Sequence, residues 1–417
     1  MQVKIPYGQK KIDVEISEPC KILVPKKVEV RDKKKLINNS LKNPIASKSF
    51  KDFISNKESL LVIINDAARN TPTADVIEEI FPDLSAHSDI KFIIATGTHR
   101  KPTEDEMKKM FGSHYDFFKE KIFVNDAKND SKMDYLGKSR YGYDFYINKM
   151  VTNAKNILVI GSIEPHYFAG YTGGRKAFLP GVSAYKTIEK NHSHALDPKA
   201  CCLNLISNPV HEGMMEVLNF LEDKNIFSIQ VILTVENKIY EVVSGNIRKS
   251  FEEGIKHTKQ VFCGNTDKKA NIVITVAQYP LDIDLYQSLK AIEHGKLVLE
   301  DGGIIILVSK CRTGIGNDAF YNLLSKTDSS QETIDSVEKN YKLGYHKAAN
   351  LAQLNLKSQI WAVTDLDKKT IEKARIKAYS DLQLAINDAV AEISKKGKDP
   401  EIIVIPSGSL TVPNLCK

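Results

Sequence analysis

The stretch SLLVIINDAARNTPT, residues 59–73, decides the fold class. It opens as a continuous apolar run and then turns polar, which is typical of a buried parallel strand that leads into a helix. Runs of the same kind recur along the chain, at 90–97, 121–126, 156–162, 227–235, 271–278, 302–310, 359–365 and 401–409. Helical stretches separate most of these runs. The sequence therefore predicts an α/β fold with predominantly parallel sheets.

The length of the chain predicts two domains. At 417 residues it exceeds what one hydrophobic core usually supports. The polar, glycine-containing segment CGNTDKKA at 263–270 is a plausible boundary. We expect an N-terminal α/β domain over 1–268, opening with short strands at 2–7 and 11–16, and a C-terminal α/β domain over 269–417. An active-site cleft is expected between them. Helices of the second domain are expected near 285–299, 316–326, 330–356 and 379–396.

Composition and charge exclude several classes of function. Hydrophobic residues make up 42% and charged residues 27% of the chain, as in ordinary soluble proteins. The lysines behind the net charge of +7 are scattered, without interleaved aromatics, so we expect no nucleic-acid partner. The apolar runs are too short to span a membrane, and no signal-peptide pattern is visible, so a cytoplasmic location is expected. The six cysteines lack C-x-x-C spacing, which favours free thiols over a zinc site.

The turn after the first apolar run, NDAARNTPT at 65–73, carries Asp66 and Arg69. Side chains that can cap and open a helix follow them: Thr71, Pro72 and Thr73. Backbone donors at a helix start, together with an arginine, suit a phosphate or a carboxylate. The alternative interpretation is a plain capped turn with a surface ion pair.

The segment ATGTHRKPTEDE at 95–106 places His99 after a turn of small residues. Thr103 and Glu106 have the spacing of a capping box, which explains part of the segment structurally. His99 is not needed for that cap. A histidine at the end of a strand can act as a general base near neutral pH.

The densest segment is GSIEPHYFAGYTGGRKAFLPGVSAYKTIEKNHSHALDP at 161–198. It contains histidines, a lysine and a glycine pair: His166, His192, His194, Lys176, Gly173 and Gly174. We expect a loop shaped around a ligand, because so many glycines disfavour regular structure. Ala177 stands where a phosphate loop has Ser or Thr, which argues against a nucleoside triphosphatase. Lys176 could carry a covalent cofactor or contact a phosphate, or the segment could be a surface loop.

A fourth segment, DIDLYQSLKAIEHG at 282–295, follows another expected strand. Tyr286, Gln287 and Lys290 begin a helix there, and the last two share a face because they are three residues apart. They offer donors for a small carboxylate. The alternative is an ordinary amphipathic helix start.

Together these motifs resemble the nickel-pincer lactate racemase family. The resemblance rests on D-x-x-R, G-T-H-R, E-P-H-Y-F-A-G-Y-x-G-G-R-K, N-H and Y-Q-S-x-K. The spacings also agree: ten residues from His166 to Lys176 and sixteen from Lys176 to His192. The matching residues extend from Asp66 to Lys290, over most of the chain.

The resemblance implies a cofactor. Members of the family use a pyridinium mononucleotide whose ring carbon and two sulfurs hold nickel(II), a donor set that suits this metal. By the motif match, Lys176 would hold the nucleotide through a thioamide, and His192 would be the fourth nickel ligand. Further cofactor contacts are implied for Asp66, Arg69, Gly173 and Gly174. Enzymes that make the cofactor would then be partners in maturation.

The resemblance also implies an activity, the interconversion of D and L enantiomers of a small 2-hydroxy acid by proton-coupled hydride transfer. His99 and His166 match the family's acid/base pair. Residues matching the substrate contacts are Arg69, Tyr286, Gln287 and Lys290. The sequence departs from the family at one point, because the family's lactate enzymes have a tryptophan lining the pocket. The single tryptophan here, Trp361, cannot be aligned with it, and Tyr345 or His346 could take its place, so a larger substrate side chain is an alternative.

Three other functions fit the residues less well. An NAD-dependent oxidoreductase of hydroxy acids needs G-x-G-x-x-G, and G-Y-T-G-G-R-K has the wrong spacing. A zinc hydrolase needs H-E-x-x-H or a similar pattern, which the chain lacks. A binding module for phosphorylated ligands explains Lys176 but not the histidines at the strand ends.

Overall fold

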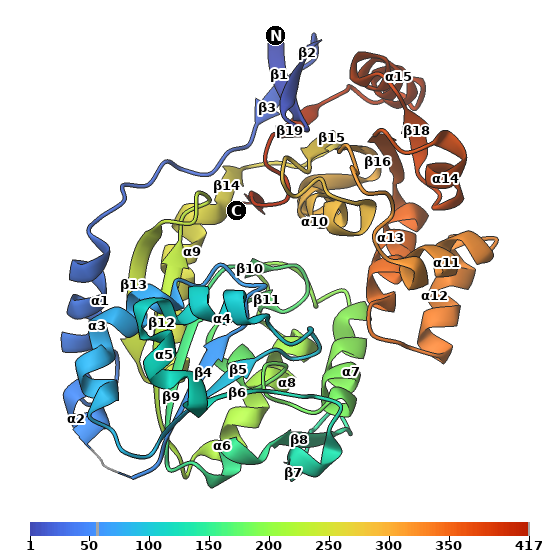
Figure 1. Ribbon diagram of the computed structural model, residues 1–417. Coiled ribbons are helices and arrows are strands. Elements are labelled where there is room, and N and C mark those ends of the chain that lie inside the picture. Colours follow the sequence, from blue (N-terminus) through green and yellow to red (C-terminus); the bar gives the residue numbers. More distant parts are fainter. Residues whose placement is uncertain (56–57, 416–417) are drawn as a thin grey trace. The chain divides into compact units, whose positions relative to one another are not determined.

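The computed structural model describes residues 1–55 and 58–415 (Figure 1). The chain forms two compact units. One unit is continuous and covers Lys27–Val261, and here we call it the central unit. The other combines Met1–Lys26 with Phe262–Lys417, and we call it the terminal unit.

The central unit is built on a sheet of strand order β13-β12-β9-β4-β5-β6. Its strands are β4 (Leu60–Asn65), β5 (Ile90–Ala95), β6 (Ile122–Val124), β9 (Asn156–Ser162), β12 (Asn225–Leu233) and β13 (Ile239–Gly245). All the pairings are parallel except that of β12 with β13. Every residue of β9 is buried, which explains why its sequence is apolar without alternation.

The order of these strands fixes where a ligand can bind. The chain passes from β4 to β5 and β6 on one side, and then returns to β9 and β12 on the other side. The neighbours β4 and β9 therefore form the topological switch point of the sheet. In open α/β sheets, ligands bind beyond the carboxyl ends of the strands at such a point.

Helices and two hairpins, each a separate two-stranded sheet, accompany this sheet in the central unit. The helices are α1 (Lys33–Lys42), α2 (Phe50–Ser55), α3 (Thr73–Ser85), α4 (Glu104–Phe111), α5 (Tyr115–Phe118), α6 (Lys149–Asn153), α7 (Tyr185–Ser193), α8 (Pro209–Glu216) and α9 (Ile247–Phe262). The hairpins are β7 (Met133–Lys138) with β8 (Asp144–Asn148), and β10 (Pro165–His166) with β11 (Gly170–Tyr171). Alternate residues of β4, among them Val62 and Ile64, pack with Val76, Ile77 and Ile80 of α3 in one core.

The terminal unit has an all-parallel sheet of strand order β18-β17-β16-β15-β19-β3. Its strands are β3 (Cys20–Ile22), β15 (Ala270–Val276), β16 (Leu299–Val308), β17 (Gln359–Val363), β18 (Lys377–Tyr379) and β19 (Ile402–Ile405). Two further pairs are β1 (Gln2–Tyr7) with β2 (Lys10–Glu15), and β14 (Cys263–Thr266) with β20 (Val412–Leu415). The helices are α10 (Leu285–Gly295), α11 (Asp318–Lys326), α12 (Ser330–Lys339), α13 (Tyr345–Lys357), α14 (Lys368–Lys373) and α15 (Leu382–Lys395).

The division into units differs from the expected domains 1–268 and 269–417. The first 26 residues lie with the terminal unit, because β3 pairs with β19. The β1–β2 hairpin also buries Val3 and Ile5 in the core of that unit. Strand pairing between distant segments therefore decides to which unit the first 26 residues belong, and the order of the sequence alone does not show this.

The α/β class with predominantly parallel sheets is confirmed, and each apolar run predicted as a strand overlaps one. The single helix expected over 330–356 is wrong. Two helices, α12 and α13, replace it, because the chain leaves the helix at Asn340 and turns through Gly344 at φ 99°. Within the described residues, no helix is long and apolar enough to cross a membrane.

Candidate active site

The turns after β4 and β5 bring Asp66 and His99 together. Asp66 directly follows β4 and is only 6% exposed, whereas His99 follows β5 through a turn in which Gly97 has φ 55°. The Nδ1 atom of His99 lies 2.6 Å from Oδ2 of Asp66. A carboxylate at Nδ1 fixes the orientation of the ring and leaves Nε2 for another partner.

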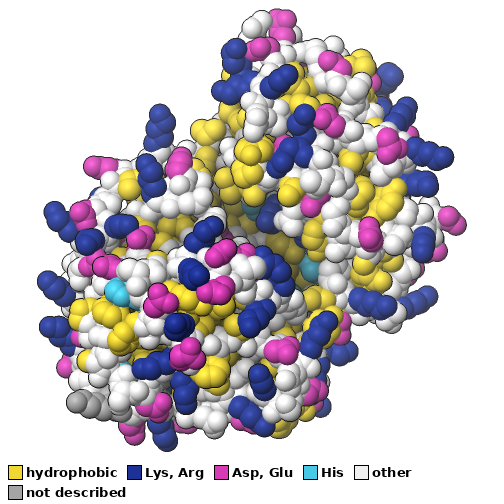
Figure 2. All heavy atoms as spheres, viewed as in Figure 1, with side chains coloured by type: hydrophobic (Ala, Val, Ile, Leu, Met, Phe, Trp, Pro, Cys, Tyr) yellow, Lys and Arg dark blue, Asp and Glu magenta, His cyan; other side chains and the backbone are white. Residues whose placement is uncertain are grey.

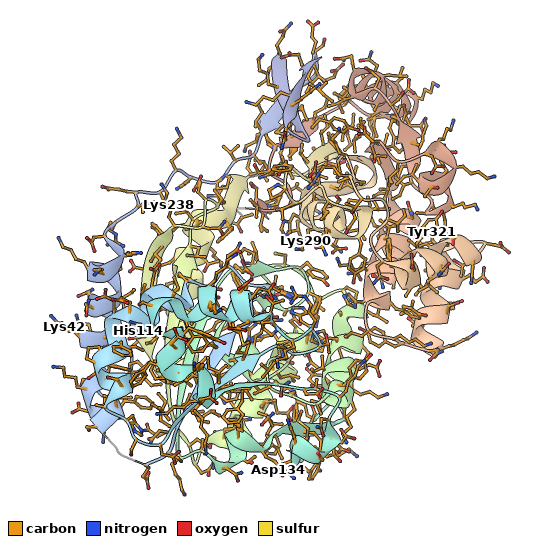
Figure 3. The ribbon with its side chains drawn as sticks, in the orientation of Figure 1. Lys42, His114, Asp134, Lys238, Lys290 and Tyr321 are labelled. Atoms are coloured by element: carbon orange, nitrogen blue, oxygen red, sulfur yellow. The ribbon has the colours of Figure 1, made fainter. Side chains whose placement is uncertain are left out.

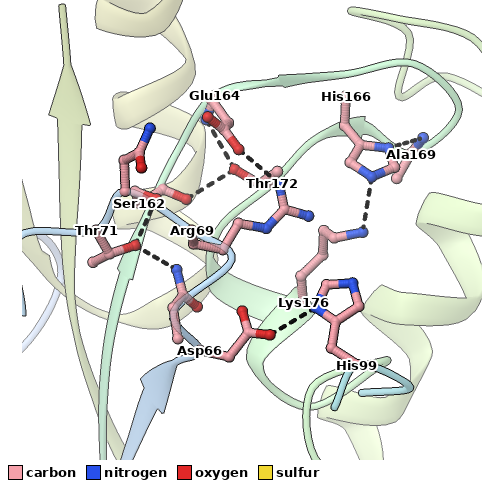
Figure 4. A network of polar contacts seen from close by, with 12 residues as sticks. Asp66, Arg69, Thr71, His99, Ser162, Glu164, His166, Ala169, Thr172 and Lys176 are labelled. Carbon is pink, nitrogen blue, oxygen red and sulfur yellow. Dashed lines mark hydrogen bonds and ion pairs between the residues drawn. The ribbon is translucent and has the colours of Figure 1, made fainter. Parts of the chain in front are cut away.

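Arg69 lies in the same turn and forms an ion pair with a partner that the sequence did not identify. Its Nη1 is 2.7 Å from Oε1 of Glu164, which follows β9. The two sides of the switch point are thereby joined (Figure 4). Both side chains remain partly exposed, so the guanidinium can also reach an anionic ligand.

The expected threonine cap of α3 is wrong. The helix begins at Thr73, and no side-chain hydrogen bond of the described residues caps it. Thr71 instead accepts a hydrogen bond from Asn65 at 2.7 Å, and its hydroxyl lies 2.9 Å from that of Ser162. Thr71 therefore ties the turn after β4 to the end of β9. The capping box of Thr103 and Glu106 at α4 is present as predicted.

The segment 161–198 is more regular than the loop that its glycines suggested. It contains the β10–β11 hairpin, a short 3-10 turn at Gly174–Ala177 and the helix α7. At Gly173, which has φ 83°, the backbone passes close to neighbouring residues of the central sheet. A Cβ atom there would lie 2.6 Å from Ile163 and 2.9 Å from Oε1 of Gln230. The glycine lets the chain pass tightly over β9 and β12 just before Lys176.

Arg175 organises this turn, and the sequence analysis missed it. The side chain is 1% exposed. It donates hydrogen bonds at 2.9–3.2 Å to the carbonyl oxygens of Ala169, Tyr171, Thr172 and Gly173. Its guanidinium also lies 4.1 Å from the ring centroid of Phe251. Burial lowers the pKa of Arg175 to about 9. No sequence spacing signals such a role, because the carbonyl partners converge only in the folded loop.

Lys176 faces His166 across the loop. Its Nζ is 3.5 Å from Nε2 of His166 and 5.8 Å from the ring centroid of Phe168. Burial and the positive charges of Arg69 and Arg175 hold the pKa of Lys176 well below its usual range. Burial and the charge of Lys176 likewise lower the pKa of His166. Both groups are therefore inclined to be neutral, with lone pairs available for bonding.

His192, on α7, completes this group. It is 9% exposed, and its ring centroid lies 5.0 Å from that of Phe168. The ring centroid of His166 lies 4.5 Å from that of Phe168, and these two rings also meet edge to face. The described residues contain no cluster of three or more His, Cys, Asp or Glu side chains that could hold a metal by themselves. His192, His166 and Lys176 thus all lie around the ring of Phe168.

The remaining expected residues lie on α10 of the terminal unit (Figure 3). Asp284 caps this helix by accepting a hydrogen bond from the backbone of Gln287 at 2.6 Å, and Gln287 and Lys290 share a face as predicted. Lys347 was missed. It donates a 2.7 Å hydrogen bond to the carbonyl of Tyr286 and lies 3.6 Å from the ring centroid. Burial and the charge of Lys290 lower the pKa of Lys347 to about 7.

Two of the residues considered for the substrate pocket, Trp361 and His346, are buried in the terminal unit. Trp361 is 2% exposed on β17, within the core of the terminal unit, and its ring lies 5.2 Å from that of Tyr379. It is therefore a core residue. His346 is buried near the start of α13, where its Nδ1 lies 3.1 Å from the hydroxyl of Tyr341.

These features define a class of protein. It is an α/β protein whose switch point carries a partly buried lysine, a histidine held by a carboxylate, and an arginine, which is a set of groups typical of an enzyme active site. Two family models match the chain: the lactate racemase N-terminal domain over residues 7–202 and the lactate racemase C-terminal domain over residues 265–412. The chain belongs to the lactate racemase family, a family of isomerases.

Individual relatives agree with this assignment. The chain is 28% identical to the lactate racemases of Thermoanaerobacterium thermosaccharolyticum and Lactiplantibacillus plantarum, each over 97% of this chain. These matches cover 97% and 98% of the relatives. The solved apoprotein of the former superposes with a TM-score of 0.90, covering 99% of this chain and all of the other. A Thermotoga maritima protein, 14% identical, shares the fold with a TM-score of 0.65, covering 92% and 98% of the two chains.

Proposed function

We propose that this chain is a racemase that interconverts the D and L enantiomers of a small 2-hydroxy acid. Lactate or a close analogue is the substrate we favour, because the relatives that match nearly the whole chain are lactate racemases. A larger 2-hydroxy acid is the alternative within the same chemistry. The observation that carries the proposal is the partly buried Lys176 amine beside His166, at the switch point that also bears Arg69.

The residues at this point fit a tethered nickel-pincer nucleotide. An amine forms a thioamide only in its neutral form, and the lowered pKa of Lys176 favours that form. The imidazole of His192 lies near the same Phe168 ring and suits nickel(II) as a nitrogen ligand. Gly173 and Gly174, with φ of 83° and 48°, keep the turn before the lysine compact. When bound, the group would supply an acceptor for hydride at a carbon of its ring.

The two histidines have complementary hydrogen-bond partners. Asp66 at Nδ1 of His99 favours the tautomer with Nδ1 protonated, so Nε2 can accept a proton. Nδ1 of His166 instead accepts a hydrogen bond from the backbone of Ala169 at 3.3 Å, so its neutral ring carries the proton on Nε2. Nε2 of His99 can thus take the hydroxyl proton of the substrate and, once the ring is an imidazolium, return a proton to the oxygen, whereas Nε2–H of His166 can donate a hydrogen bond to that oxygen. Racemisation needs groups at both positions, because the hydroxyl of each enantiomer has a different position relative to a fixed C2.

The carboxylate of the substrate needs a fixed cation throughout. We assign this role to Arg69, which Glu164 holds in place. Removal of the hydroxyl proton and of the C2 hydride turns the acid into a planar 2-oxo acid. Return of a hydride to the opposite face of C2 and of a proton to the oxygen would then give the other enantiomer. Tyr286, Gln287 and Lys290 remain proposed substrate contacts on α10, on the strength of their donors.

The intact mass of the protein tests the tether. Full-length chain co-produced with cofactor-synthesis enzymes should carry a covalent adduct and nickel. Lys176→Ala should have the unmodified mass, whereas Lys138→Ala, an exposed lysine on β7, should keep the adduct. An unmodified wild-type mass without nickel under these conditions would falsify the proposal.

His99→Asn and His166→Asn separate catalysis from attachment. Each variant should retain the adduct and lose racemisation by about 100-fold or more, as expected when a general acid or base is removed. Full activity in both variants would remove the acid/base role of these histidines and leave the tether intact.

A further inference from the structure

A buried amide beside the hairpin that carries His166 has no part in the proposed reaction so far. On the visible surface, lysine and arginine are commonly interspersed with acidic side chains, where water can also reach them (Figure 2). Asn208, which directly precedes α8, is instead 0% exposed. A buried amide has to find its hydrogen-bond partners inside the protein, so the partners of Asn208 show what this side chain holds in place.

The side chain of Asn208 joins the start of α8 to the β10–β11 hairpin. Its Oδ1 accepts hydrogen bonds from the backbone of Val210 and His211 at 3.1 and 3.2 Å, which caps the helix. Its Nδ2 donates to the carbonyl oxygens of Phe168 and Asn204, both at 2.9 Å. The donors at Oδ1 and the acceptors at Nδ2 together fix the orientation of the amide. A serine or threonine could also cap the helix, but neither has the second group of donors.

The chain just before this side chain is held against the same hairpin. Leu203 and Ser207 have φ of 63° and 53°, a conformation that residues with a Cβ atom rarely adopt. The backbone nitrogen of Leu203 donates to the carbonyl oxygen of Gly170 at 3.2 Å. A Cβ atom at Gly170 would lie 2.5 Å from the carbonyl oxygen of Asn204. Strained conformations persist only where surrounding contacts hold them, and here such contacts are made to the β10–β11 hairpin.

One peptide group connects Asn208 to His166. The carbonyl oxygen of Phe168, which Asn208 binds, and the N–H of Ala169 belong to the same peptide unit. This unit is planar and trans, so the two groups point in opposite directions and turn together. The N–H donates to Nδ1 of His166 at 3.3 Å (Figure 4). A hydrogen bond to the carbonyl oxygen therefore fixes the direction of the N–H and strengthens it as a donor.

We propose that Asn208 is a positioning residue that sets the tautomer of His166 through this peptide group. A donor at Nδ1 leaves the proton of the neutral ring on Nε2, the nitrogen that lies 3.5 Å from Nζ of Lys176. Asp66 selects the opposite tautomer of His99 by direct contact. The inference rests on the proposed function, because it gives the physical reason why one ring of the histidine pair can donate a hydrogen bond to the substrate oxygen.

Nuclear magnetic resonance of the full-length apoprotein reads the tautomer directly. In isotope-labelled histidine, the chemical shifts of the two ring nitrogens report which of them carries the proton. The spectrum is taken at about pH 8, where the lowered pKa of His166 leaves its ring neutral. We expect the proton on Nε2, and His166→Asn identifies the signals by their loss. A wild-type His166 ring with its proton on Nδ1 overturns the proposal.

Substitutions at two helix caps separate this role from capping. Asn208→Ser and Asn208→Thr keep an oxygen that can cap α8 but remove the donor to Phe168. The signals of the two His166 ring nitrogens should then move toward each other, because the peptide group is released and the tautomers exchange. Asn317 caps α11 by accepting from the backbone of Phe320 at 2.8 Å, so Asn317→Ser is the matched control and should leave these signals unchanged. Threonine fills more of the space and carries the test should the serine variant not fold. Unchanged signals in a folded Asn208 variant, or equal shifts in the control, overturn the proposal.

Racemisation by the cofactor-loaded protein gives a second measurement. Asn208→Ser should keep the adduct and the nickel and lower kcat about tenfold, as expected for the loss of one hydrogen bond. KM should stay that of the wild type, because Arg69 is untouched. In the His166→Asn background the same substitution should cause no further loss. An equal loss in both backgrounds would indicate a merely structural role and overturn the proposal. A wild type without the adduct would count against the proposed function alone, because the apoprotein spectra do not depend on the cofactor.

Discussion

The amine of Lys176 is surrounded by groups that oppose its charge. Arg69 and Arg175 are both positive and close enough to lower its pKa, and burial acts in the same direction. His166 offers a ring nitrogen at 3.5 Å, and the negative charge of Glu164 offsets the lowering only in part. These surroundings favour the neutral amine of Lys176 at a pH where exposed lysines remain protonated.

This property predicts the pH dependence of acylation. Because its pKa is lowered, Lys176 becomes fully neutral at a lower pH than an exposed lysine does. Its acylation rate should therefore reach a plateau at a lower pH. Competitive labelling of the apoprotein with acetic anhydride between pH 6 and 10, followed by peptide mass spectrometry, measures both rates. Lys138 serves as the exposed reference. If the two midpoints coincide, the charges around Lys176 do not have the effect described.

At the scale of elements, the switch point depends on how tightly the Lys176 turn packs on β9 and β12. Gly173 permits this contact through its positive φ and its missing Cβ. Gln230, on β12, then accepts a hydrogen bond from the backbone of Gly174 at 2.9 Å. Arg175 binds four carbonyl oxygens of the loop from within. The elements therefore position Lys176 through backbone contacts.

Two glycines allow the cost of a positive φ to be compared with the cost of an overlapping Cβ atom. Gly173 and Gly142 have nearly the same φ, 83° and 85°, but no described atom lies within 4 Å of a Cβ at Gly142. Gly142→Ala should cost about 1–2 kcal/mol through its backbone conformation alone. Gly173→Ala should cost about 1–3 kcal/mol more, because the methyl group overlaps Ile163 and Gln230. Thermal unfolding of both variants measures the difference, and equal melting temperatures would contradict the close approach.

At the scale of the whole molecule, the beginning of the chain belongs to the unit formed by its end. β3 forms the edge of the terminal sheet, and the hairpin before it buries apolar side chains in the same core: Val3, Ile5, Val14 and Ile16. Each such side chain contributes about 1.5–3 kcal/mol when fully buried. The central unit has a continuous chain and its own core.

Deletion of residues 1–26 should therefore destabilise the terminal unit selectively. Hydrogen exchange followed by mass spectrometry should show faster exchange in β15 and β19, because the edge strand and the hairpin are gone. Peptides from β4 and β9 should exchange as in the full chain. Uniformly faster exchange in both units would contradict the division at residues 26 and 262.

The sequence by itself determined the features that depend on neighbours along the chain. Apolar runs fixed the strands, because a strand buried on both faces has no polar positions. The turns after those strands indicated Asp66, Arg69 and His99 as site residues, because functional side chains usually lie at the carboxyl ends of parallel strands. The capping box at Thr103 followed from spacing alone. The resemblance of the motifs, ending at Lys290, pointed to the family that the matches then confirmed.

Only the tertiary structure decided features that join distant segments. Glu164 meets Arg69, and Arg175 finds its carbonyl partners, only when the loop folds over β9. The first 26 residues join the terminal unit through pairing with β19. Such contacts cross long sequence separations, where local propensity and spacing carry no information about which groups meet.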